Sequence, residues 1–90
     1  MKNLEIIVSG RVQGVCYRAF VLEKAQELNI KGYTRNLMNG DVEIIAVGEE
    51  SILEIFINLL QKGPSMARVD IIETSEIIIG EGFSDFRIKY

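Results

Sequence analysis

The stretch Gly10-Arg11-Val12-Gln13-Gly14-Val15-Cys16-Tyr17-Arg18 joins two segments whose apolar residues repeat with different periods. Before it, Leu4, Ile6 and Val8 occupy alternate positions, which predicts a strand. After it, apolar residues recur at helical spacing from Tyr17 to Asn29, which predicts a helix. The stretch is therefore expected to be a short loop that leads from a strand into a helix.

The composition of this loop suits the binding of an anion. Two glycines bracket it, and glycine lets backbone N–H groups turn inward and approach a ligand. No Ser, Thr, Asp or Asn lies between Gly10 and Arg18, so the helix start has no side-chain cap for its free N–H groups. Arg18 adds a planar fork that matches phosphate oxygens. The loop alone indicates either a phosphate cradle or an ordinary glycine turn capped by water.

The rest of the chain predicts five further helices and strands and one turn. They are a strand over Ile30–Leu37, a two-residue hairpin turn at Asn39-Gly40, a strand over Asp41–Val47, a helix from Glu49 to Gly63-Pro64, a strand over Met66–Glu73 and a short strand over Phe83–Tyr90. This order predicts an α+β, ferredoxin-like fold (β-α-β-β-α-β), with an antiparallel sheet, two helices on one face and a short C-terminal strand. The segment Ile77–Gly82 is expected to cover the core as a strand end, or else to form a bulged edge or contact surface.

Composition limits the classes of protein that the chain can belong to. With 90 residues, of which 48% are apolar, residues 1–90 are expected to form a single domain. The net charge of −3 argues against broad binding to nucleic acid or anionic lipid. A single cysteine and the lack of a signal-peptide or membrane-length apolar run favour a cytoplasmic protein without a membrane partner.

Several catalytic chemistries are excluded by the residues that the chain lacks. There is no histidine, so a Ser-His-Asp or Cys-His system and a histidine-based zinc site are impossible within this chain. The loop lacks the Gly-Lys-Ser/Thr of a Walker A motif. Cys16 is not followed by an arginine at the spacing of a cysteine phosphatase loop, because position 22 is Leu22. Asp41 and Glu43 are interpreted as a solvated strand edge. We expect no metal and no cofactor.

What remains is an arginine, backbone N–H groups and neutral amides. Such a site can orient water and neutralise developing charge, but it cannot supply strong acid–base catalysis. It suits a substrate that already carries a good leaving group, and a mixed carboxylic–phosphoric anhydride has that property.

At this point the sequence resembles a known family. The stretch from Gly10 to Arg18 closely resembles the phosphate-loop motif of the acylphosphatase family. Further matches to the family pattern are Gly32-Tyr33-Thr34-Arg35-Asn36, Asn39-Gly40-Asp41-Val42-Glu43, Gly63-Pro64, Ala67 and Val69. The similarity covers essentially the whole chain, so residues 1–90 are interpreted as one acylphosphatase-like domain.

The resemblance implies metal-independent hydrolysis of acyl phosphates to a carboxylate and inorganic phosphate, without a covalent intermediate. It places the phosphate-binding arginine at Arg18 and the water-positioning asparagine at Asn36. The cradle role falls on Arg11, Val12, Gln13, Gly14, Val15, Cys16 and Tyr17. We expect a monomer that acts on a small-molecule acyl phosphate, releases inorganic phosphate as a product and is inhibited by it.

The chain departs from the family pattern at a few positions, and two alternatives stay open. Tyr17 stands where Phe is common, and Thr34 where a small apolar residue is more usual. Lys31-Gly32-Tyr33 resembles the opening of an RNA-recognition motif, but the residues that follow lack the aromatics needed for base stacking. The other alternative is a ferredoxin-like module that binds a phosphate or metabolite without turnover.

Overall fold

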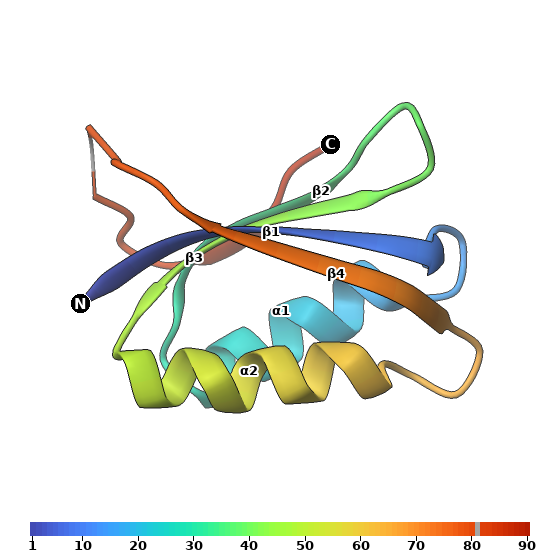
Figure 1. The fold of residues 1–90 in the computed structure, drawn as a ribbon, viewed down its shortest axis with the longest axis horizontal. Coiled ribbons are helices and arrows are strands. Elements are labelled where there is room, and N and C mark those ends of the chain that lie inside the picture. The colour runs from blue at the N-terminus through green and yellow to red at the C-terminus, as the bar shows by residue number, and fades with distance from the viewer. Residues whose placement is uncertain (81) are drawn as a thin grey trace.

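The computed structural model of the chain describes residues 1–80 and 82–90. Its elements follow the predicted order and are shown in Figure 1. They are β1 (Lys2–Arg11), α1 (Tyr17–Glu27), β2 (Lys31–Asn36), β3 (Val42–Gly48), α2 (Glu50–Lys62), β4 (Arg68–Glu76) and β5 (Phe86–Ile88).

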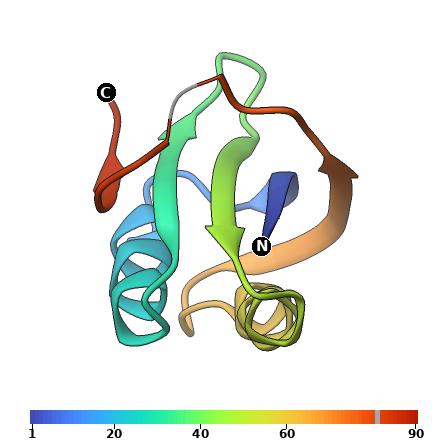
Figure 2. The same cartoon turned by 90° about the vertical axis from the view of Figure 1, so that its left-hand side faces the viewer.

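The strands form one sheet in the order β4-β1-β3-β2-β5. The pairs β1–β3, β1–β4 and β2–β3 are antiparallel, whereas β5 pairs with β2 in parallel. The sheet is therefore mixed rather than wholly antiparallel. The reason is the connection from β4 to β5, which passes from one edge of the sheet to the other instead of closing a hairpin (Figure 2). The predicted ferredoxin-like α+β fold is confirmed.

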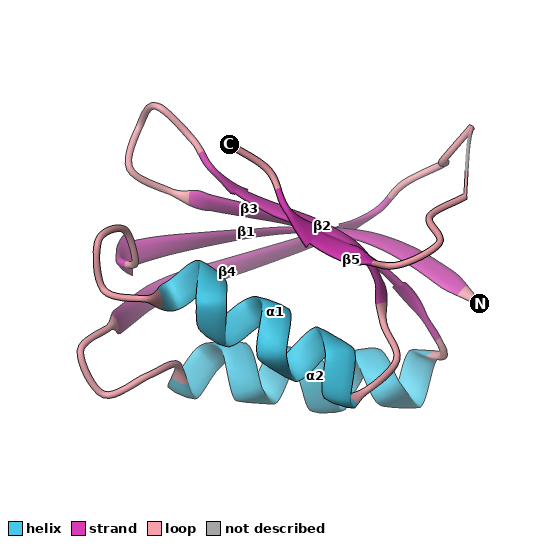
Figure 3. Cartoon of the chain, turned by 180° about the vertical axis from the view of Figure 1, so that it is seen from behind, coloured by secondary structure: helices cyan, strands magenta, loops and turns pink. Residues whose placement is uncertain are grey.

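Both helices lie on the same face of the sheet, and the core lies between them and the strands (Figure 3). α1 buries one stripe of side chains and α2 buries a second, as helices with a 3.6-residue period do against a sheet. The buried positions on the helices are Tyr17, Val21, Ala25, Leu53, Phe56 and Leu60. Removal of this apolar surface from water stabilises the two-layer arrangement.

The predicted hairpin exists, but its loop differs from the prediction. The Leu37 N–H donates to the Asp41 carbonyl oxygen at 2.8 Å, and the Gly40 N–H donates to the Leu37 carbonyl oxygen at 3.2 Å. These bonds close a loop of three residues between Leu37 and Asp41, the next most common hairpin geometry after the two-residue turn. β3 consequently begins at Val42 rather than at Asp41.

The segment around the three isoleucines also differs from the prediction. β4 ends at Glu76, and Ile78 is 99% exposed, so the expectation that this segment covers the core is wrong for Ile78. The chain has already left the sheet there, although the Ile77 N–H still donates to the Asn3 carbonyl oxygen. Glu81, within the same predicted segment, lies outside the described residues.

Three connections gather at one end of the molecule: the β1–α1 loop, the β2–β3 hairpin and the α2–β4 connection (Figures 1 and 3). None of the helices in the described residues is long and apolar enough to cross a membrane. The residues that the sequence identified as a candidate site lie at this end of the molecule.

Candidate active site

The loop begins at an irregularity in the pairing of β1 with β4. The register shifts between Ser9 and Gly10, which indicates a bulge. Gly10 has a φ of 132°, and a Cβ at this position would collide with the carbonyl oxygen of Arg68. A residue without a side chain is therefore required where the chain leaves the sheet.

Two residues of the loop adopt left-handed conformations. Gly14 has a φ of 71° and Cys16 a φ of 63°, and Cys16 precedes α1 without making a side-chain cap. Left-handed residues interspersed in a turn point successive N–H groups into one concavity, which is an arrangement that binds anions. Within residues 1–80 and 82–90, the N–H groups of residues 13–19 donate to no other protein group. The predicted absence of a side-chain cap is confirmed.

Arg18 lies in the first turn of α1, beside a cavity of about 190 Å³. The residues that line this cavity are Val12, Gly14, Cys16, Tyr17, Arg18, Ala19, Ile88 and Tyr90. In the described part of the chain no carboxylate lies within salt-bridge distance of Arg18. The guanidinium is therefore available to an anion, and the free end of the α1 dipole favours negative charge at the same place.

Three residues of the predicted cradle can contribute little besides their backbone, because their side chains belong to the core. Val12, Val15 and Tyr17 are all buried. The Tyr17 hydroxyl donates to the Leu60 carbonyl oxygen of α2 at 2.7 Å, and burial raises the pKa of Tyr17. These anchors hold the start of α1 against α2, which keeps the loop backbone in place.

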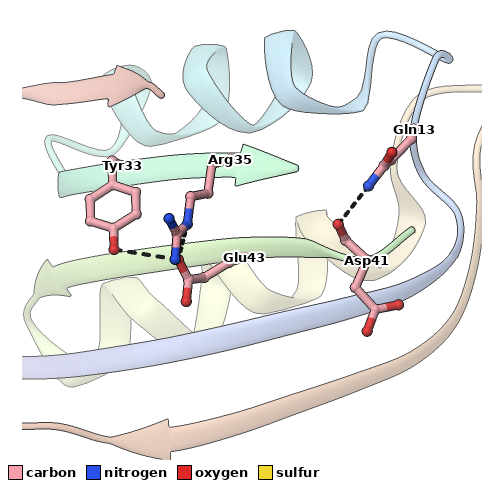
Figure 4. Close-up of polar contacts among 5 residues, drawn as sticks. All are labelled: Gln13, Tyr33, Arg35, Asp41 and Glu43. Atoms are coloured by element: carbon pink, nitrogen blue, oxygen red, sulfur yellow. Dashed lines mark hydrogen bonds and ion pairs between the residues drawn. The ribbon is translucent and has the colours of Figure 1, made fainter. Parts of the chain in front are cut away.

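Asn36 is the last residue of β2 and lies on the same face of the strand as the buried Thr34. Its Oδ1 atom is buried and makes no hydrogen bond with the described residues. Asn36 is not among the residues that line the cavity beside Arg18. The hairpin that follows it is nevertheless joined to the loop by Gln13, whose side chain points toward Asp41 (Figure 4).

The remaining basic residues of the two motifs lie elsewhere. Arg11 is exposed at the end of β1, opposite Arg68, and does not line the cavity. Arg35 lies on the face of β2 opposite to Asn36, and its Nε atom donates to Oε1 of Glu43 at 2.7 Å (Figure 4). Glu43 is only 8% exposed because β3 is the central strand, so the interpretation of Glu43 as a solvated strand edge is wrong.

Three contributors to the cavity were not identified from the sequence, namely Ala19, Ile88 and Tyr90. Ile88 belongs to β5, and Tyr90 follows it. The alternation of apolar residues near the C-terminus predicts a strand there. Its partner strand, β2, is known only from the structure, in which Ile88 pairs with Thr34. In the residues that the structure describes, no group of three or more His, Cys, Asp or Glu side chains could hold a metal ion.

A two-layer α+β fold whose loop amides lie beside an arginine has the arrangement that small anion-binding proteins use. Comparison with known proteins specifies the class further. A model of the family described as Acylphosphatase matches residues 4–88. The chain belongs to the acylphosphatase family.

Individual relatives agree with this assignment. The acylphosphatase of Thermus thermophilus is 49% identical over 73 residues, covering 81% of this chain and 83% of the relative. The acylphosphatase of Archaeoglobus fulgidus is 46% identical over 90 residues and covers both chains completely. The crystal structure of acylphosphatase from Bacillus subtilis superimposes with a TM-score of 0.95 at 38% identity, again over the full length of both chains. The chain is a hydrolase that acts on acyl phosphates, and the RNA-binding and non-catalytic alternatives are not favoured.

Proposed function

We propose that the loop of residues 11–17 and Arg18 bind the phosphoryl group of the acyl phosphate, and that Asn36 orients the attacking water. The observation that supports this proposal is the cavity in which Gly14, Cys16 and Arg18 meet at the start of α1, beside N–H groups that have no hydrogen-bond partner among the described residues. A phosphoryl group carries three non-bridging oxygens, and these amides with the guanidinium offer donors to all of them.

Arg18 contributes charge and geometry together. Its planar fork can donate two parallel hydrogen bonds to phosphoryl oxygens, which a lysine ammonium cannot reproduce. Phosphoryl transfer requires mainly positioning and stabilisation of charge on those oxygens. Donors that are already oriented by the fold pay no reorganisation cost when that charge develops.

Asn36 supplies the second half of the site. Its buried Oδ1 can accept a hydrogen bond from a water molecule, which orients that water toward phosphorus. The water oxygen forms the new bond to phosphorus while the bond to the acyl oxygen breaks, and the electron pair leaves with the carboxylate. Because the chain has no histidine, a phosphoryl oxygen of the substrate takes the proton of the water.

The roles of Arg18 and Asn36 can be tested with benzoyl phosphate as substrate and inorganic phosphate as inhibitor. Loss of one preorganised donor costs about 2.7–4 kcal/mol, or about 100- to 1000-fold in rate. Arg18→Ala should lose at least this much and should also bind phosphate weakly, and Arg18→Lys should be poor as well. Asn36→Ala should lower kcat while phosphate inhibition remains. Arg87→Ala and Asn58→Ala, at exposed positions, are the matched controls. Near-normal hydrolysis by Arg18→Ala or Asn36→Ala would contradict the assignment of that residue.

The proposal extends to the state in which the protein works. We infer that residues 1–90 act as one domain, as a cytoplasmic monomer that is inhibited by its product phosphate and binds no nucleic acid. The single hydrophobic core found in the described residues, the single cysteine and the net charge of −3 support this inference. Light scattering of the purified protein should give the mass of one chain, and RNA should not be retained at low salt. A dimer mass or salt-dependent RNA retention would contradict it.

A further inference from the structure

The side chain of Gln13 extends from the loop between β1 and α1 to the base of the β2–β3 hairpin (Figure 4). Its Nε2 atom lies 2.9 Å from the Leu37 carbonyl oxygen and 2.8 Å from the Asp41 carbonyl oxygen. A carboxamide nitrogen carries two hydrogens, so both are donated to the hairpin. The opposite orientation of the amide would bring its oxygen against two carbonyl oxygens, which fixes the nitrogen as the atom between them.

The two carbonyl groups that accept from Gln13 are also the ones that close the hairpin. The Leu37 oxygen accepts from the Gly40 N–H, and the Asp41 oxygen accepts from the Leu37 N–H. A carbonyl oxygen has two lone pairs, so each can accept a second bond from Gln13. The Gln13 amide is therefore part of the hydrogen-bond network at the base of the hairpin. One of the two residues that it contacts, Leu37, directly follows Asn36.

Few hydrogen bonds join the loop to the hairpin in the described residues. The pairing of β1 with β3 ends at Val8 and Val42, before the chain reaches Gln13. Beyond that point, within residues 1–80 and 82–90, the two hydrogen bonds of Gln13 are the only ones that join residues 12–16 to residues 36–41. These two hydrogen bonds are therefore the polar link between the loop and the hairpin in the described residues.

We propose that Gln13 is a positioning residue that sets the place of Asn36 relative to the phosphoryl group held by the loop. This inference rests on the roles proposed above for Arg18 and Asn36. A direct role of the Gln13 side chain in binding phosphate is disfavoured, because both hydrogens of its amide are already donated and its remaining oxygen is an acceptor. An acceptor cannot bind an anionic oxygen.

The expected effect is on turnover rather than on phosphate affinity. A misplacement of about 1 Å in a reacting group can cost about 100-fold in rate. Gln13→Met keeps the length of the side chain but removes both donors, so we expect kcat for benzoyl phosphate to fall by about 10- to 100-fold. The inhibition constant of inorganic phosphate should stay close to that of the unchanged protein, because the loop amides and Arg18 remain.

A double-mutant cycle separates a positioning role from a merely structural one. If Gln13 acts through Asn36, Gln13→Met should add little further loss of kcat in the Asn36→Ala background, because the coupled residues are non-additive. Asn39→Ala is the matched control: Asn39 accepts a hydrogen bond from the Asp41 N–H within the same hairpin, but in the described residues it makes no hydrogen bond with the loop. We expect Asn39→Ala to keep its kcat.

Gln13→Lys provides a second variant that keeps a donor for the two carbonyl groups. It should retain clearly more of its kcat than Gln13→Met, and urea unfolding of both variants checks that they are folded. An unchanged kcat in Gln13→Met, fully additive losses with Asn36→Ala, or a parallel loss of phosphate affinity would overturn the inference. If Gln13→Met did not fold, a folded Gln13→Lys variant with fully additive losses in the same cycle would overturn it. Full activity of Asn36→Ala alone would instead overturn the proposed role of Asn36.

Discussion

The guanidinium of Arg18 lies over the ring of Tyr90, with its Cζ atom 5.1 Å from the ring centroid. Arg18 belongs to α1, whereas Tyr90 follows β5, so this contact joins the start of α1 to the C-terminal residue beside the cavity. A cation over an aromatic face is attracted by the ring quadrupole. The contact restricts where the charged group of Arg18 can lie before substrate arrives.

Removal of the Tyr90 ring should weaken phosphate binding. The interaction is exposed, so its loss should cost about 0.5–1 kcal/mol, or about two- to fivefold in the inhibition constant of inorganic phosphate. Tyr90→Ala should show this loss, whereas Tyr90→Phe keeps the ring and should resemble the unchanged protein. Inhibition assays with benzoyl phosphate as substrate measure both. Equal phosphate inhibition in the two variants would show that the ring does not hold Arg18.

The left-handed conformation of Cys16 should be costly for a residue with a side chain. Its φ is 63°, and this region costs an ordinary L-residue about 1–2 kcal/mol. Cys16→Gly removes that strain but adds flexibility to the unfolded chain, so we expect a net gain in stability of up to about 1 kcal/mol. Cys16→Val should be clearly less stable, because its branched Cβ fits this region poorly. Urea unfolding gives the order, and a Gly variant less stable than the Val variant would contradict it.

The hydroxyl of Thr34 is expected to destabilise the fold. Thr34 is 0% exposed, and its Oγ1 atom makes no hydrogen bond with the described residues. A buried polar group without a partner costs about 1–3 kcal/mol, so Thr34→Val should be more stable by about that amount. Thr34→Ser keeps the hydroxyl and loses a methyl group, and it should be less stable than the unchanged protein. A less stable Val variant in urea unfolding would show that the hydroxyl has a partner.

Ionisation of Glu5 should reduce stability as the pH rises. Burial and the neighbouring Glu43 carboxylate raise the pKa of Glu5 above its ordinary value of 4.5. The folded state therefore retains the proton more tightly than the unfolded state does. The stability contributed by the protonated form is fully present below pH 4.5 and is lost as the pH rises through the raised pKa of the folded state.

Glu5→Gln imitates the protonated form and tests this expectation. Glu5→Gln should increase the free energy of unfolding at neutral pH. This increase should become smaller as the pH falls, and it should vanish below the ordinary pKa of Glu5. Urea unfolding at several pH values measures the difference, with Glu54→Gln, at an exposed position of α2, as the control. A gain that does not change with pH would arise from packing rather than from ionisation.

The local elements were predictable because each depends on residues close together in the sequence. The alternation of apolar residues from Leu4 to Val8 indicates which side chains of β1 face the core. The Gly63-Pro64 pair predicts the end of α2, whose last residue is Lys62. The uncapped start of α1 was predictable because capping depends on the residues beside Cys16. The motif around Arg18 and Asn36 predicted the family, and the comparisons confirm it.

Other features depend on residues that lie far apart in the chain. The parallel pairing of β5 with β2 places Tyr90 over Arg18, and no local period encodes a pairing register between distant strands. The two hydrogen bonds from Gln13 to the hairpin likewise join residues that are 24 and 28 positions apart.

The sequence by itself determined the elements, the uncapped loop and the family of this protein, because these follow from periodicity and from motifs of neighbouring residues. The tertiary structure alone decided that β5 pairs in parallel with β2 and that the Gln13 side chain bonds to the β2–β3 hairpin. It also decided that the Tyr90 ring lies against the Arg18 guanidinium. The physical reason is that these contacts form only when the helices and strands pack together, and packing brings distant side chains into a register that local preferences do not specify.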